Sequence, residues 1–326
     1  MKSIISINSD VIIKRNILNN VLITGACGYV GKALVPKLKH TNIVSIDRFY
    51  DDKIHHQSNR FFCDDLNGLS SDAESFLESF SGKIIHLAAA RTDDSIQETY
   101  EKDNVKATQA LIKNLNPKKI NLFIHVGSVA AIDGKFLEQN RANITSPDDW
   151  YRVSKYQQQL HIESWAKNNN VPLVILAPSA IYDNDAKKNS TNIGRLEKAV
   201  SLFKVVPEIN ILKSLTSMSN FIKAIVCLVN RKTENTNDID TDLVNRYLII
   251  DKPIMTVTEI CKNKFKARLV IRIPKLKTLL LIISGFISLM GLCKIIPLSK
   301  ERIIKLYKPT DYKDEMGYKE WLDEEA

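Results

Sequence analysis

The chain has 326 residues, enough for one large domain or two smaller ones around a buried core. Apolar residues make up 44% and charged residues 25%, which is typical of a soluble globular protein. The net charge is +9, yet no basic helix interleaved with aromatic residues appears, so nucleic-acid binding is not expected. The five cysteines are widely separated and include no CxxC pair, which argues against a disulfide framework or a metal site and fits a cytoplasmic protein.

Residues 1–19 form an N-terminal extension that lacks the compact apolar core and cleavage site of a signal peptide. From residue 20 onward, short β-branched runs alternate with helical patterns. The predicted strands are 21–24, 43–47, 83–87, 122–126 and 173–177, and the predicted helices are 32–39, 71–80, 99–115 and 150–168. Such alternation is typical of βαβ units around a parallel sheet.

The predicted fold class is therefore α/β, a Rossmann-type doubly wound parallel sheet with a smaller, mixed C-terminal region. We expect the dinucleotide-binding domain over residues 20–185, completed by a strand near 246–250. Residues 186–326, where the pattern becomes mixed and polar, are expected to form most of the substrate-binding region.

The first predicted strand runs into a glycine pattern that then opens a helix. In this context the pattern indicates a dinucleotide-binding turn. The first glycine permits a tight turn, the second lets the backbone approach the pyrophosphate, and the third lets the helix pack closely against the strand. The expected contacts are Gly25, Cys27, Gly28, Tyr29, Val30 and Gly31. Asp47 ends the next strand, where a carboxylate binds the ribose hydroxyls and repels a 2′-phosphate, so NAD is favoured over NADP, with Arg48 alongside weakening that preference.

A tyrosine and a lysine four residues apart, Tyr151 and Lys155, would share one face of a helix. The lysine ammonium stabilises the phenolate, so the tyrosine can exchange a proton with a substrate hydroxyl while hydride moves to or from a nicotinamide. Ser128, at the end of the strand that precedes them, is the candidate for orienting the substrate oxygen. We predict these three as the catalytic residues.

Residues 278–293 carry no charge and are flanked by Lys275, Lys277 and Lys294. This run is slightly short for a membrane span, which needs about 20 residues. We expect a helix buried in the protein or at the subunit contact of a homodimer. Peripheral contact with the inner face of a membrane is the alternative.

With these residues in place, residues 20–320 resemble an extended short-chain dehydrogenase/reductase of the NAD-dependent epimerase/dehydratase family, which acts mainly on nucleotide-linked sugars. The resemblance implies an adenine contact at the Asp-Leu pair, Asp65-Leu66, and further cofactor contacts at the end of the predicted strand 83–87 and on the following helix. The implied residues are Asp64, Asp65, Leu66, Leu87, Ala88, Ala89, Asn104, Tyr151, Lys155 and Pro178 for the cofactor, and Arg91, Ser128 and Lys213 for the substrate.

The resemblance predicts an NAD(P)-dependent epimerase or keto-reductase/dehydrogenase of a nucleotide-diphosphate sugar, in surface-polysaccharide sugar synthesis. Val129 and Ala130 stand where the family's dehydratases place an Asp-Glu pair, so dehydration is not expected. Epimerase and reductase use Tyr151, Lys155 and Ser128 alike, so both remain open. The alternative is a dehydrogenase or isomerase of an apolar, steroid-like or isoprenoid-like alcohol. A non-catalytic dinucleotide-binding subunit is disfavoured, because such proteins typically lose the tyrosine or the lysine.

Overall fold

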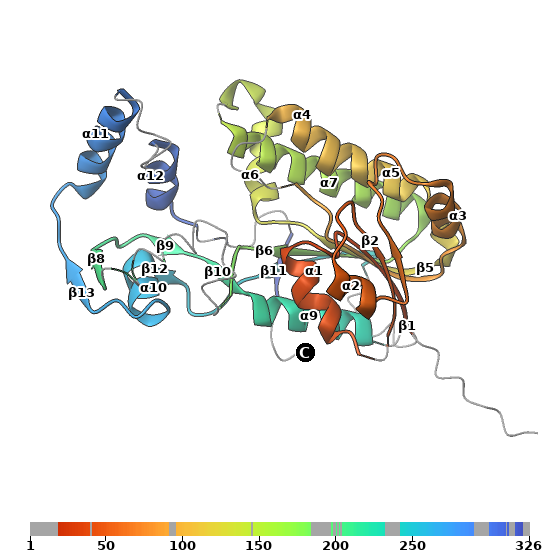
Figure 1. Cartoon of the computed structure of the whole chain (residues 1–326). Helices are drawn as coiled ribbons and strands as arrows, with labels where there is room; N and C mark the ends of the chain where they lie inside the picture. Colours follow the sequence, from red (N-terminus) through yellow and green to blue (C-terminus); the bar gives the residue numbers. More distant parts are fainter. Residues whose placement is uncertain are drawn as a thin grey trace, which may run out of the picture.

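The computed structural model describes residues 19–39, 41–90, 96–144, 146–183, 204–231, 242–289, 300–310 and 317–321, together with 197, 200, 202 and 312. An eight-stranded parallel sheet in the order β14-β11-β6-β5-β4-β1-β2-β3 forms its centre (Figure 1). The strands are β1 (Asn19–Thr24), β2 (Thr41–Ile46), β3 (Arg60–Phe62), β4 (Gly82–His86), β5 (Ile120–Val126), β6 (Leu173–Pro178), β11 (Val244–Ile249) and β14 (Lys319–Glu320). This confirms the predicted α/β class and the strand expected near 246–250.

Helices cover both faces of the sheet. They are α1 (Tyr29–Leu34), α2 (Asp52–Gln57), α3 (Ser71–Ser79), α4 (Gln97–Tyr100), the π-helix η2 (Glu101–Lys106), α5 (Ala107–Lys113), α6 (Ala130–Gln139), α7 (Pro147–Asn169) and α9 (Met218–Asn230). Short 3-10 turns follow at η1 (Val35–Lys37), η3 (Pro117–Lys119) and η4 (Arg141–Asn143). The predicted helix 32–39 ends early, at Leu34, because Pro36 offers no backbone N–H and its ring obstructs a continued helix.

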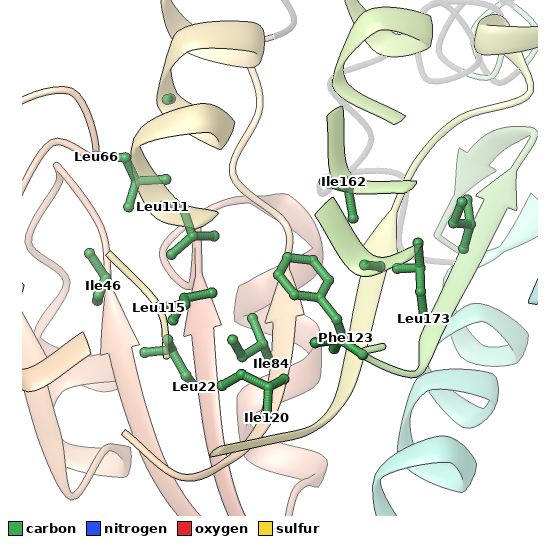
Figure 2. Packing of buried hydrophobic residues seen from close by; sticks show 14 of the residues in the cluster. Leu22, Ile46, Leu66, Ile84, Leu111, Leu115, Ile120, Phe123, Ile162 and Leu173 are labelled. Atoms are coloured by element: carbon green, nitrogen blue, oxygen red, sulfur yellow. The ribbon is translucent and has the colours of Figure 1, made fainter. Parts of the chain in front are cut away.

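Alternate side chains of each strand point to opposite faces, so the sheet lies between two apolar cores. In one core, Leu22, Ile84 and Phe123 pack with residues of α3, α5 and α7, as Figure 2 shows. In the other, Ile23, Ile85 and neighbouring strand residues pack with α1, α2 and α9. Strands buried on both faces explain why their sequences read as continuous apolar runs.

Helix α9 comes from the chain beyond residue 200, yet it packs against β1 and α1 of the sheet domain. It buries Phe221, Ile225 and other residues at helical spacing against the second core. Lys83, only 4% exposed in β4, donates from Nζ to the carbonyls of Val229 (2.5 Å) and Arg231 (2.7 Å) at the end of this helix. The last carbonyl groups of a helix receive no hydrogen bond from the helix itself, and the Lys83 ammonium supplies one here.

The remaining elements form a smaller lobe with a separate apolar core. Its strands pair as β7 (Ala180–Tyr182) with β10 (Leu215–Ser217), β8 (Val205–Pro207) with β13 (Leu269–Ile271), and β9 (Leu212–Lys213) with β12 (Met255–Thr256). Its helices are α10 (Val257–Asn263), α11 (Leu276–Leu289) and α12 (Lys300–Tyr307). Figure 1 shows α11 away from the parallel sheet, whereas α12 lies between α11 and α6. Lys308, next to the end of α12, donates from Nζ to Asp133 of α6 at 3.1 Å.

Helix α11 contains most of the apolar run predicted as a buried helix; residues 290–293 lie outside the described part. Its inner side is buried, since Leu276 is 8% and Ser284 4% exposed. Its outer side is not, because Ile282 is 65% exposed. Burial within this chain therefore holds for the inner side only, and the predicted subunit contact for the outer side stays a prediction. Among the described residues, we find no helix with the length and apolarity that crossing a bilayer requires.

Candidate active site

The turn between β1 and α1 has the geometry that its glycines predict. Gly25 adopts φ +73°, and a Cβ there would lie 2.7 Å from the Ala88 backbone nitrogen. A Cβ on Gly31 would lie 2.2 Å from the carbonyl oxygen of Ala26, so the first turn of α1 sits directly against the loop. Gly28 immediately precedes α1 and uses no side chain to cap it. The backbone N–H groups at the start of α1 are thus left for an anion.

Asp47 follows β2 and joins this turn to the second strand. Its carboxylate accepts hydrogen bonds from the backbone N–H of Cys27 (2.8 Å) and of Phe49 (2.9 Å). Arg48 beside it bonds Asp103 of η2 at 2.9 Å and approaches Asp65 at 4.0 Å. Because two carboxylates already share the Arg48 charge, it is poorly placed to attract a 2′-phosphate.

A cavity of about 170 Å³ opens above these strand ends and is bordered by ten of the residues predicted to bind the cofactor. They are Gly25, Cys27, Gly28, Asp47, Asp64, Asp65, Leu66, Leu87, Ala88 and Ala89. The cavity wall also includes residues that the sequence analysis did not assign to the site, among them Phe49, Asn67 and Asp103. Their side chains come from loops after three different strands and from η2, so no local pattern could group them.

The other predicted cofactor residues do not line this cavity. Tyr29 and Val30 are half-buried in α1, and burial raises the pKa of Tyr29 to about 12. Pro178 ends β6 and accepts a hydrogen bond from the Val129 N–H. Asn104 is completely buried, and its Oδ1 accepts from the Ala90 N–H (2.6 Å) while its Nδ2 donates to the Ser154 hydroxyl (2.8 Å). Asn104 thereby holds the loop after β4 against α7.

Helix α7 carries both predicted proton-transfer residues. It begins at a capping box formed by Ser146 and Asp149, with Pro147 in its first turn, so the helix start is set locally. Tyr151 is half-buried, and its ring lies 5.8 Å from that of Tyr100. Lys155 follows one turn later and is 2% exposed.

The Lys155 ammonium is fixed between a strand end and its own helix. Its Nζ donates to the Val126 carbonyl (3.3 Å) and to the Gln158 side-chain oxygen. Burial lowers the pKa of Lys155 from 10.5 to about 7. The ammonium, the form that stabilises a tyrosine phenolate, is thus costly to bury, and these two oxygens hold it in place.

Gln158 belongs to a buried polar network that sequence reasoning did not find. Its Nε2 donates to the Thr108 hydroxyl (2.8 Å) and lies 3.1 Å from His86 Nε2. His86 also contacts Thr24 Oγ1 through Nδ1 at 2.6 Å. The network therefore connects the catalytic helix to β1 and β4. The only available signal was that Gln158 stands three residues after Lys155, on the same helical face.

Ser128 lies after β5, two residues beyond the Val126 carbonyl that receives Lys155. Its hydroxyl accepts a hydrogen bond from the Ala130 N–H at 3.2 Å. Helix α6, which starts at Ala130, packs closely on α7, since a Cβ on Gly134 would lie 2.1 Å from the Arg152 carbonyl oxygen. The end of β5 and the Tyr151 turn of α7 are thus brought together.

The two remaining substrate candidates are placed differently. Arg91 lies outside the described residues. Lys213 is in β9 of the smaller lobe, where its Nζ donates to the Lys308 carbonyl. Burial lowers the pKa of Lys213 to about 8, with nearby Lys308 contributing.

The residues present fit a dinucleotide such as NAD. Gly25 and Gly31 have no space for a side chain, a carboxylate stands at the end of β2, and small residues follow β4. When bound, NAD would be held by the backbone N–H groups at the start of α1 and by Asp47 in this cavity.

Comparison with known proteins gives a consistent result. Residues 21–234 match the NAD dependent epimerase/dehydratase family. The chain is 27% identical over 268 residues to UDP-glucose 4-epimerase of Vibrio cholerae, which covers 73% of this chain and 78% of that protein.

Two solved structures share the fold. The UDP-glucuronic acid 4-epimerase from Bacillus cereus, in complex with NAD, gives a TM-score of 0.58 at 19% identity, covering 78% of this chain and 86% of the other. The terminal R domain of the myxalamid PKS-NRPS pathway gives a TM-score of 0.64 at 18% identity, covering 89% of this chain and 77% of the other.

Proposed function

The chain belongs to the NAD-dependent epimerase/dehydratase family, and from this premise we propose that it epimerises the sugar of a nucleoside-diphosphate sugar. The observation that carries the proposal is the fixed position of Lys155, whose ammonium is anchored at the end of β5 one helical turn from Tyr151. The similarity to UDP-glucose 4-epimerase of Vibrio cholerae supports the epimerase among the reactions that this site could perform.

In this proposal Tyr151 removes the proton from a sugar hydroxyl and later returns it. NAD supplies the chemistry that no side chain can, by accepting a hydride from the same sugar carbon and giving it back. Lys155 stabilises the Tyr151 phenolate, and the Ser128 hydroxyl binds the sugar oxygen. Epimerisation would require the keto sugar to present its other face before its oxygen is protonated again by Tyr151.

The residues after Ser128 argue against dehydration in the structure as in the sequence. Val129 is 7% exposed and apolar, and Ala130 begins α6. Neither side chain can exchange a proton, whereas elimination of water needs an additional acid and base. A nucleotide sugar made here would be a donor for a glycosyl-transfer reaction.

The test is to incubate the purified chain with UDP- and dTDP-hexoses and to follow products by chromatography and the nicotinamide by absorbance. An epimerase interconverts a pair of sugar nucleotides without net change in the absorbance of reduced nicotinamide. Net consumption of added NADH on a 4-keto sugar nucleotide would instead show a keto-reductase. If no sugar nucleotide reacts and none raises the Tm, the proposal is wrong.

A further inference from the structure

Nearly half of the large apolar side chains that are exposed in the described residues lie in one part of the smaller lobe. Of fifteen such exposed residues in the described chain, seven lie between residues 269 and 304. They are Leu269, Ile271, Ile273, Leu279, Ile282, Ile283 and Ile304. Single exposed apolar residues are ordinary, but a group of this kind marks a binding surface. We refer to residues 269–283 as the lobe tip.

Helix α11 is anchored on one side and uncovered on the other. Leu276 and Ser284 are buried, and Leu280 packs against the core of the lobe. Leu279 and Ile282 are 44% and 65% exposed, and their spacing places them together on the opposite side of the helix. The helix is therefore held in place while it presents an apolar stripe to the surroundings, at the end of the molecule far from the sheet (Figure 1).

A longer segment that includes the lobe tip contains the whole basic excess of the chain. Residues 262–308 include twelve lysines and arginines against one glutamate, so the remaining sequence is slightly acidic, although the chain as a whole is +9. Arg272 pairs with Glu208 at 3.7 Å. Within the residues that the structure describes, Lys266, Arg268 and Lys275 form no ion pair. The apolar stripe of α11 thus lies in a segment with a large excess of positive charge, of which Arg272 and Lys308 are paired with carboxylates.

We propose that the lobe tip docks on the surface of an anionic phospholipid bilayer, with α11 lying in the interface. Lipid tails would receive the outer side chains of α11, and lipid phosphates would balance the lysines at its start, whose long stems let the charge remain in the headgroup region. With 14 residues, α11 is about 21 Å long, so it lies on the bilayer rather than across it.

Charge decides between a bilayer and a second copy of the chain. A twofold contact through the lobe tip would bring the same patch of both copies together, and hence two strongly basic segments. Like charges at this density oppose such a contact, whereas an anionic surface is attracted by them. The proposal is independent of the reaction that the active site catalyses.

The experiment is flotation of the full chain with vesicles of phosphatidylcholine alone and with vesicles that also contain phosphatidylglycerol, each at low and high salt. We expect the chain to float with the anionic vesicles and to be released by salt, because screening weakens the attraction. No flotation, or equal flotation with both kinds of vesicle, would refute the proposal.

Matched variants test whether the lobe tip is responsible. Leu279→Ser and Leu160→Ser each change a helical leucine of nearly equal exposure, 44% and 43%, but only the first lies in the lobe tip. Leu279→Ser should reduce lipid binding at least about fivefold, as expected for withdrawing one buried aliphatic side chain, while Leu160→Ser should not. Lys275→Gln should reduce it about fivefold, as expected for one charge at an anionic surface.

Circular dichroism and sedimentation of the same variants complete the test. All three should keep the parent's spectrum, because the altered side chains are exposed. A dimer in lipid-free solution that Leu279→Ser dissociates would overturn the proposal in favour of a second copy. Equal loss of lipid binding in Leu279→Ser and Leu160→Ser would overturn it as well.

Discussion

Replacement of the buried lysine by methionine, Lys155→Met, should make the stability of the protein less dependent on pH. Burial lowers the pKa of Lys155 to about 7 in the folded protein, against 10.5 when the chain is unfolded. Between these values the unfolded chain binds a proton that the folded protein does not. The free energy of unfolding of the parent must therefore rise with pH over this window, by up to about 1.4 kcal/mol per unit.

The expected size follows from the two pKa values. Between about pH 6.5 and 9.5 the parent should gain about 3 kcal/mol relative to Lys155→Met, with the steepest rise above pH 7. Other groups near Lys155 do not mask this change. His86 and His125 share the buried region, but burial lowers the pKa of both below this range, so both stay uncharged throughout.

The assay is urea unfolding of NAD-free parent and Lys155→Met, followed by circular dichroism across this pH range. Lys167→Met is the control, because Lys167 is an exposed lysine on the same helix. Its difference from the parent should stay constant over the range. If the difference between the parent and Lys155→Met is equally flat, the ammonium is not desolvated and the account of Lys155 fails.

Three further results are expected. Tyr151→Phe should keep NAD affinity and fold but lose at least about a hundredfold in turnover, because only the proton-transferring oxygen is removed; activity within a few-fold of the parent, measured by product chromatography, would exclude Tyr151 as the acid/base. Asp47→Asn should raise the use of NADP relative to NAD about tenfold in cofactor titrations, since a repelling charge disappears, and a parent that already prefers NADP would contradict this reading. Gly31→Ala should lower the free energy of unfolding by at least about 2 kcal/mol, because its Cβ would lie 2.2 Å from the Ala26 oxygen, whereas Gly68→Ala meets nothing within 4 Å and should be neutral in the same denaturation assay.

The sequence predicted the elements whose structure follows from the pattern of neighbouring residues. Five strands of the sheet begin and end within two residues of their predicted bounds, because a strand buried on both faces is a short apolar run. The short β3 and α2 were missed, since three to six residues carry too little periodicity. The sequence of α9 shows an amphipathic pattern, but that pattern does not say which face of the sheet the helix covers. This depends on contacts with residues far away in the sequence.

The candidate site divides in the same way. Gly25, Tyr151 and Lys155 stand in motifs whose spacing has a physical reason, so sequence alone could assign them roles. Arg48 and Asp103 meet across 55 residues, and Gln158 reaches His86 across 72, so their pairing appears only once the chain is folded. The apolar run at 278–293 predicted a helix. Local hydropathy does not show which side of that helix packs against the rest of the chain and which side stays exposed.

The link between Lys83 and the end of α9 has a consequence for biosynthesis. A ribosome that has released only the first half of the chain would display β4 with an ammonium in an apolar sheet face and no carbonyl to receive it. That face closes only when residues 218–231 arrive, and the sheet edge only when β11 and β14 follow. We therefore expect the nascent nucleotide-binding half to remain exposed and dependent on chaperones until β14 has been made. A fragment ending near residue 185 should aggregate when it is produced alone.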